Sequence, residues 1–273
     1  MRQWIKRGAA ALLAGLLVVV PAAMAADEAP QAAAMPTAKM AAEIAVSAVT
    51  VPAGETWELL LVNPWNPLPE DFQVELVSLK NGMQVDKRIY EELNAMLTDC
   101  WAAGLKPVVC SAYRTQATQT RLHNNKIARL RAAGYSKEAA VKEASRWVAV
   151  PGTSEHQTGL ALDLVSMDYQ LLNEKQEETP EQKWFMEHCW EYGFILRYPA
   201  EKAEITGIGY EPWHYRYVGK EAAAAIHASG QCLEEYLLTV SAAEVGGTAS
   251  ISISTSGETA QPSPLFLKKN GDG

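Results

Sequence analysis

The sequence predicts one α+β domain in which helices pack around an antiparallel sheet. Segments with helical spacing come early in the chain, strand-like segments cluster later, and no regular strand–helix–strand alternation connects them. The 273 residues, 48% hydrophobic and 21% charged, suit one domain with terminal extensions. This composition excludes a wholly disordered or fibrous chain.

Residues 1–25 resemble a secretory signal. A basic start is followed by a short uncharged apolar run, a proline and an A-x-A pattern that ends at Ala25. The run is shorter than the about 20 apolar residues of a spanning helix. The alternative is a retained membrane anchor, because residues 9–26 carry no charge. The sequence therefore predicts an exported protein that contacts a membrane only if the signal is retained.

The rest of the chain divides by composition into three parts. Residues 26–54 are rich in Ala and Pro and are typical of a spacer, residues 55–238 form the predicted domain, and residues 239–273 form a Ser/Thr/Gly-rich tail that we expect to be flexible. Without the signal, 21 basic and 32 acidic residues leave a net charge of −11. This acidic balance argues against nucleic acid as a partner.

The first half of the domain is predicted to be mainly helical. Residues 86–103 carry apolar side chains at helical spacing and stop at a glycine, and residues 107–112 are an apolar, β-branched run that predicts a strand. Two further helices are expected over residues 115–133 and 136–147, the second with Ser136 as its N-cap.

Most predicted strands lie in the second half. Residues 160–165 alternate as a strand, and residues 194–198 and 213–218 have similar patterns. Between them, the sequence Thr179-Pro180-Glu181-Gln182 is a capping box that predicts a helix as far as Tyr192. A last helix over residues 222–228 is expected to end at Gly230.

The four cysteines leave two interpretations open. An even number in an exported protein permits disulfides, whereas the apolar surroundings of each cysteine suit a buried free thiol. None has the spacing of a C-x-x-C metal knuckle. The residues are Cys100, Cys110, Cys189 and Cys232.

Two of the five histidines lie in segments rich in Gly, Pro and polar residues, where binding groups are common. His156 precedes the strand that contains Asp163, and Gly159 between them can turn the chain so that the two side chains converge. A carboxylate inside an apolar strand is costly unless it is paired or binds a metal. The other three histidines lie in predicted helices and are interpreted as packed or surface residues.

The second segment contains His214, with Glu211 three residues before it. Two histidines and one carboxylate are a common ligand set for catalytic Zn²⁺, with a fourth position left for water. Glu211 would then be the general base. Each segment alone is a weak signal, since Asp163 could instead pair with Lys or Arg. A third segment places Arg114 at a strand end, where from the residues alone a surface arginine that caps a turn is favoured.

Taken in order, the three segments carry a specific signature. They read Ser111-x-Tyr113-Arg114-Thr115, then Ser154-x-His156-x-x-Gly159-x-Ala161-x-Asp163, then Glu211-x-x-His214. This order resembles the LAS metallopeptidases, and the nearest branch resembles the VanY-type D-alanyl-D-alanine carboxypeptidases. The resemblance extends over about residues 58–238 and implies a small α+β domain whose antiparallel sheet carries a zinc site.

The resemblance also implies roles for individual residues. His156, Asp163 and His214 match the zinc ligands, and Glu211 matches the catalytic base that later protonates the leaving amine. Arg114 matches an arginine that faces the substrate and stabilises the oxyanion. Gln119 and Ser154 match polar positions that contact the terminal residue of the substrate, and Tyr113 is placed with them as a substrate-binding residue.

The implied activity is release of D-alanine from peptidoglycan stem peptides. An L,D-carboxypeptidase or a D,D-dipeptidase of the same family remains an alternative, because the shared motifs do not separate them. A non-catalytic peptidoglycan-binding protein would be expected to lack a ligand or the glutamate. A structural zinc domain would usually close its site with four protein ligands.

Overall fold

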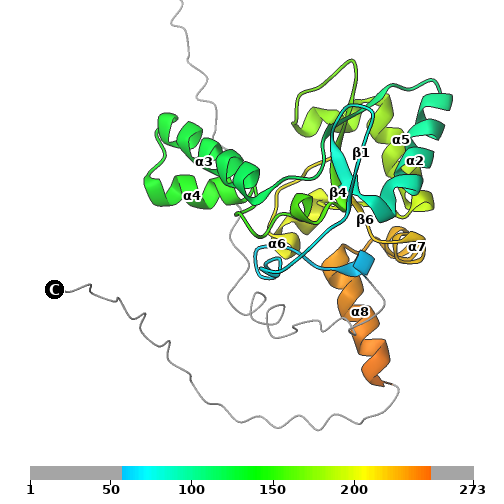
Figure 1. The fold of residues 1–273 in the computed structure, drawn as a ribbon. Helices are drawn as coiled ribbons and strands as arrows, with labels where there is room; N and C mark the ends of the chain where they lie inside the picture. Colours follow the sequence, from blue (N-terminus) through cyan, green and yellow to red (C-terminus); the bar gives the residue numbers. More distant parts are fainter. Residues whose placement is uncertain (1–56, 247–273) are drawn as a thin grey trace, which may run out of the picture. The chain divides into compact units, whose positions relative to one another are not determined.

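The computed structural model describes residues 57–246, and the proposed signal, the spacer and residues 247–273 lie outside that range (Figure 1). Its centre is a four-stranded antiparallel sheet in the order β3-β4-β6-β5. The strands are β3 (Pro107–Ser111), β4 (Ala161–Ser166), β5 (Phe194–Leu196) and β6 (His214–Tyr217). All four were predicted, and the α+β class with an antiparallel sheet is confirmed.

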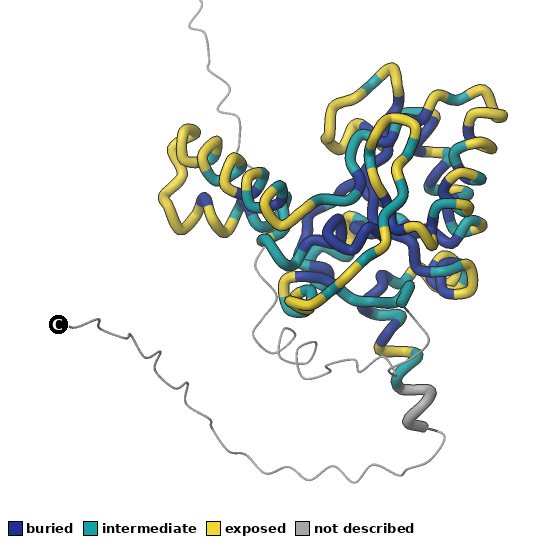
Figure 2. The backbone as a smooth tube through the Cα atoms, viewed as in Figure 1, coloured by how far each residue is buried: buried dark blue, intermediate teal, exposed yellow. Residues whose placement is uncertain are grey.

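The strand β4 is buried along its whole length because it lies between two neighbours and is covered on both faces. Leu160, just before it, and Leu162 and Leu164 belong to the main apolar core with Phe185 of α5 (Pro180–His188). The helix α2 (Tyr90–Ala102) packs against the same core. Since side chains alternate along a strand, Asp163 points to the other face. Figure 2 shows the buried path through the sheet and the exposed outer turns of the helices.

The helices α3 (Gln116–Ala132) and α4 (Lys137–Ser145) lie side by side (Figure 1). The N-cap expected at Ser136 is confirmed, because Ser136 accepts from the Ala139 amide. Thr115 caps α3 by accepting from the Thr118 amide. A β-hairpin of β1 (Leu76–Ser78) and β2 (Gln84–Asp86) and a short helix α6 (Ala203–Thr206) were not predicted.

The helices α7 (Lys220–Ser229) and α8 (Leu233–Gly246) complete the described fold. Leu233 and Leu237 of α8 are buried with Ile226 of α7 in a second apolar cluster. No helix was predicted here, and α8 crosses the domain boundary expected at residue 238 and continues to Gly246. The expectation of a flexible tail beginning at residue 239 is corrected accordingly. No helix within residues 57–246 is long and apolar enough to span a membrane.

The capping box before α5 forms only in part. The Thr179 hydroxyl accepts from the Gln182 amide, as predicted. The Gln182 side chain does not return to Thr179 but donates to the Leu164 carbonyl and accepts from the Tyr215 hydroxyl. It therefore ties α5 to two strands of the sheet. The expected helix to Tyr192 ends at His188 and continues as a 3₁₀ turn, Cys189–Tyr192.

All four cysteines are free thiols, which decides between the two interpretations in favour of small packed residues. Three are buried, and Cys110 is partly buried. Burial raises the pKa of each thiol to about 12, so all four stay protonated at neutral pH.

Gly159 makes the turn between His156 and β4. Its φ is +78°, and a Cβ built on it would lie 2.8 Å from the backbone nitrogen of Asp86. Replacing Gly159 by alanine is therefore expected to cost about 1–2 kcal/mol for the left-handed backbone and roughly 1–3 kcal/mol for the backbone clash. Urea unfolding should show the loss. Gly134→Ala is the control, because Gly134 has φ +96° but nothing within 4 Å of the added Cβ. Equal losses in the two variants would contradict the proposed clash.

Candidate active site

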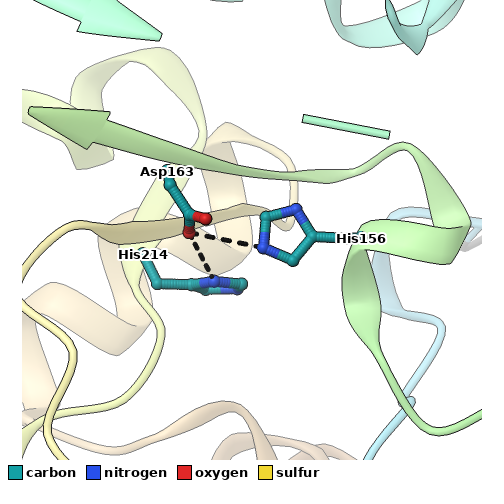
Figure 3. A group of neighbouring side chains, drawn as sticks. All are labelled: His156, Asp163 and His214. Carbon is teal, nitrogen blue, oxygen red and sulfur yellow. Dashed lines mark hydrogen bonds and ion pairs between the residues drawn. The ribbon is translucent and has the colours of Figure 1, made fainter. Parts of the chain in front are cut away.

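Three side chains from two neighbouring strands and the turn before them meet at one end of the sheet (Figure 3). Asp163 and His214 are directly paired across β4 and β6. His156 comes from the 3₁₀ turn Glu155–Thr158, and Gly159 brings it back over the strand, as the sequence predicted. One ligand atom from each side chain lies within 4.8 Å of the others, and all three residues are buried.

The carboxylate of Asp163 lies between the two imidazole rings. Its Oδ1 atom is 3.3 Å from His156 Nε2 and 3.1 Å from His214 Nδ1. Figure 3 draws both contacts as dashed lines. The outer nitrogen of His156, Nδ1, lies 2.8 Å from the Ala112 carbonyl oxygen. A proton on Nδ1 that bonds this carbonyl leaves Nε2 as a free ligand atom directed at the centre of the group.

Burial and charge control protonation at this centre. Burial, followed by the nearby Arg114, lowers the pKa of His156 to about 4, which keeps its ring neutral. Burial alone would raise the pKa of Asp163, but the two histidines and Arg114 outweigh it and hold that pKa well below its usual range. The pKa of His214 is raised to about 9, because the nearby carboxylates of Asp163 and Glu155 outweigh the effect of burial.

Glu211 lies beside this group, with Oε2 3.8 Å from His214 Nδ1. A backbone bond from the His214 amide to the Glu211 carbonyl closes the turn that contains Pro212, so both side chains face the same space. Burial raises the pKa of Glu211 to about 8. A carboxyl group that titrates near neutral pH is suited to accept and return a proton.

Arg114 is held by three side chains. It donates from Nε to Ser111 Oγ at 2.9 Å, from Nη2 to Asp163 Oδ2 at 2.7 Å and from Nη1 to Gln119 Oε1 at 3.4 Å. Its side chain keeps 17% exposure and lines the cleft. The arginine therefore fixes the free oxygen of Asp163 and also presents positive charge to whatever occupies the cleft.

The cleft beside these residues has a volume of about 970 Å³. Arg114, Glu211 and the three clustered residues line one part of it. The remaining wall comes from α3, from the loop before the 3₁₀ turn at Glu155, from residues 172–175 and from Tyr198, Ile208 and Trp213. Side chains on this wall that the sequence analysis did not single out are Lys126, Trp147, Leu172 and Tyr198. The space suits a peptide rather than a single small ion.

The three expected substrate-contact residues differ in whether they line the cleft. Ser154 is buried and lines the cleft, in accord with its predicted position. Gln119 is fully buried, with its amide bonded to the Ala149 carbonyl and to Arg114, so its predicted substrate contact lacks structural support. Tyr113 is half-buried and is not among the described residues that line the cleft. Gln119 contacts Arg114, and it too is not among the described residues that line the cleft.

A family model described as "VanY: D-alanyl-D-alanine carboxypeptidase" matches residues 82–220. The chain belongs to the VanY family. This match contains the three clustered residues, Glu211 and Arg114.

Individual VanY relatives support this assignment. The D-alanyl-D-alanine carboxypeptidase of Enterococcus faecalis is 46% identical over 185 residues, which are 68% of this chain and 67% of the relative. A glutamate-to-alanine mutant of the vancomycin resistance D,D-pentapeptidase VanY, solved in complex with Zn(II), is 45% identical with a TM-score of 0.62, covering 66% of this chain and 99% of that one. The LD-carboxypeptidase LdcB is 34% identical with a TM-score of 0.55, covering 65% and 84%.

The donor set of this VanY chain fits zinc. Two imidazole nitrogens and one carboxylate oxygen are the hard and borderline ligands that Zn²⁺ accepts, and three protein ligands leave a position open. The three residues line a cleft large enough for a peptide, which suits a catalytic rather than a closed structural site.

We expect Arg114→Lys to lower kcat by about 10²-fold. A lysine ammonium cannot hold Ser111 and Asp163 together while it also faces the cleft. Steady-state release of the terminal amino acid measures the effect. Arg129→Lys is the matched control, because Arg129 lines the same cleft but is exposed on α3. A wild-type kcat in Arg114→Lys would show that the guanidinium group of Arg114 is not needed for catalysis.

Proposed function

We propose that this chain is a zinc-dependent D,D-carboxypeptidase that cleaves the terminal D-alanyl-D-alanine bond of peptidoglycan stem peptides and releases D-alanine. The observation that carries the proposal is the buried His156–Asp163–His214 group with Glu211 beside it at the base of a peptide-sized cleft. The Enterococcus faecalis relative is named as a D-alanyl-D-alanine carboxypeptidase, and the zinc-bound VanY as a D,D-pentapeptidase.

His156, Asp163 and His214 would hold the zinc ion, which when bound activates water at neutral pH and polarises the scissile carbonyl. Glu211 accepts the proton of the attacking water and then delivers it to the departing amine of D-alanine. The same carboxyl group can do both, because its side chain faces the cleft from the turn before β6. Arg114 stabilises the negative charge that develops on the carbonyl oxygen.

Specificity for the terminal residues is tested by product analysis on stem peptides of different length. The zinc-loaded protein is incubated with tri-, tetra- and pentapeptide stems, and released amino acids are identified. We expect D-alanine from the pentapeptide and little release from the tetrapeptide. Faster release from the tetrapeptide would favour the L,D-activity named for LdcB, and release of D-alanyl-D-alanine would favour a dipeptidase. No hydrolysis of any stem would overturn the proposal.

We further propose that the protein acts outside the cytoplasm, at the cell wall. Its substrate would be located there, and the pattern of residues 1–25 resembles an export signal. Fractionation of cells that express the full chain, with N-terminal sequencing of the product, tests this. A mature N-terminus after Ala25 is expected. Full-length protein confined to the cytoplasm would contradict it.

A further inference from the structure

Glu155 is a fully buried carboxylate between two residues of the site, Ser154 and His156. Its Oε1 atom accepts from Arg197 Nε at 2.7 Å and from Arg216 Nη1 at 2.8 Å. Both arginines are themselves fully buried. One oxygen of Glu155 thus accepts two hydrogen bonds, and two guanidinium groups, from β6 and from the residue after β5, fix the orientation of the carboxylate.

The second oxygen of Glu155 is directed at a metal ligand. Oε2 lies 3.6 Å from His214 Nε2. Within the described part of the chain, neither of these two buried atoms has a hydrogen-bond partner. Buried polar atoms without partners are rare, because each costs about 1–3 kcal/mol. An unpaired acceptor and an unpaired nitrogen that face each other indicate a contact that closes by a shift of roughly half an ångström.

The positions of the two ring nitrogens of His214 indicate the role of this contact. Its Nδ1 faces Asp163 Oδ1 and the cleft, so Nδ1 is the atom available for a metal. A neutral imidazole that binds metal through Nδ1 carries its proton on Nε2, and this proton needs an acceptor. His156 already has such an acceptor in the Ala112 carbonyl. For His214 the corresponding atom is Glu155 Oε2.

We propose that Glu155 is a positioning residue that accepts the Nε2 proton of His214 and so holds this ring in the tautomer and orientation that bind zinc. The two arginines hold Glu155 in place from behind. This inference rests on the zinc-dependent function proposed above, but zinc binding is measured without substrate, so the two proposals can fail separately.

The same network contains a matched control. Arg197 also donates to Glu234 of α8, from Nη1 at 2.9 Å and from Nη2 at 2.6 Å. Glu234 is as buried as Glu155 and carries the same charge, but its contacts are Arg197 and Asn63 rather than His214. Replacing either glutamate by glutamine leaves one uncompensated arginine charge in the interior. The substitution at residue 155 alone changes the atom that faces the zinc ligand.

The experiment compares Glu155→Gln with Glu234→Gln. Glutamine keeps the shape of the side chain, but one end becomes an NH₂ donor, which must face either the arginine donors or His214. If the carbonyl oxygen of the new glutamine accepts from the two arginines, its NH₂ group faces His214 Nε2 as a donor. This donor favours the His214 tautomer with its proton on Nδ1, which blocks the metal-binding atom. We expect a zinc dissociation constant, measured by competition with a chromophoric chelator, that is 10–100-fold higher in Glu155→Gln. In Glu234→Gln we expect a change of less than about threefold, with thermal unfolding of the metal-free protein lowered similarly in both.

Equal zinc affinities in the two variants would overturn the proposal, since Glu155 would then act only on stability. Should Glu155→Gln fail to fold, the wild-type protein decides the question. With ¹⁵N-labelled histidine in the zinc-loaded protein, we expect His214 Nδ1 to be metal-bound and Nε2 to be protonated in a hydrogen bond. Zinc on Nε2, or an Nε2 proton that exchanges freely with water, would equally overturn the role assigned to Glu155.

Discussion

Replacing Glu211 by alanine is expected to lower kcat by about 10³-fold or more while the protein still binds zinc. The carboxyl group lies 3.8 Å from His214 Nδ1, close enough to serve the reacting water but outside the three-residue ligand group. Its removal therefore takes away the proton acceptor and leaves the metal ligands in place. D-alanine release and zinc content are measured on the same sample.

Glu174→Ala is the control for this experiment. Glu174 lines the same cleft but is exposed, and it is not part of the buried group around Asp163. We expect it to keep kcat within a few-fold of the wild type. If purified Glu211→Ala released D-alanine at the wild-type rate, Glu211 could not be the general base.

The second large effect is expected for His214→Ala, which should lose both zinc and activity. Two remaining ligands, His156 and Asp163, do not make a stable zinc site, and Arg114 would compete for the freed carboxylate. Elemental analysis should give about one zinc per chain for the wild type and close to none for the variant after dialysis.

His188→Ala is the matched control for metal loss. His188 is a partly exposed histidine of α5 whose ring contacts Glu191 and Trp184, away from the metal group. It should keep its zinc. A His214→Ala protein that still held one equivalent of zinc would mean that the metal binds elsewhere.

The sequence predicted the elements whose signals are local. Leu160, Leu162 and Leu164 alternate because they face one apolar core, and Ser136 is an N-cap that needs only its own helix. The β1–β2 hairpin escaped prediction because strands of three residues are too short to show a period. The helix α8 as a whole was not predicted, because Leu233 and Leu237 anchor it by packing in a cluster with other elements, which the local sequence does not show.

The residues of the site that belong to ordered sequence motifs were predictable. Residues that join the site only through contacts with distant parts of the chain were not. The comparison with a family supplied the roles of His156, Asp163, His214 and Glu211, and the structure brings all four together. Glu155 looked like an ordinary polar loop residue. Its burial depends on Arg197 and Arg216, which adjoin it only after the sheet has formed. A hint was available, since an arginine within an apolar strand requires a buried partner.

The pairing of Asp163 with His214 across β4 and β6 has a consequence for how long the metal stays bound. These strands occupy the two central positions of the sheet, so small openings of the surface helices do not separate the two ligands. Exchange of the bound ion with the surrounding solution should therefore be slow in the folded protein and should accelerate in mild denaturant together with hydrogen exchange of the β4 amides. The residence time of the metal would then report the stability of the centre of the sheet.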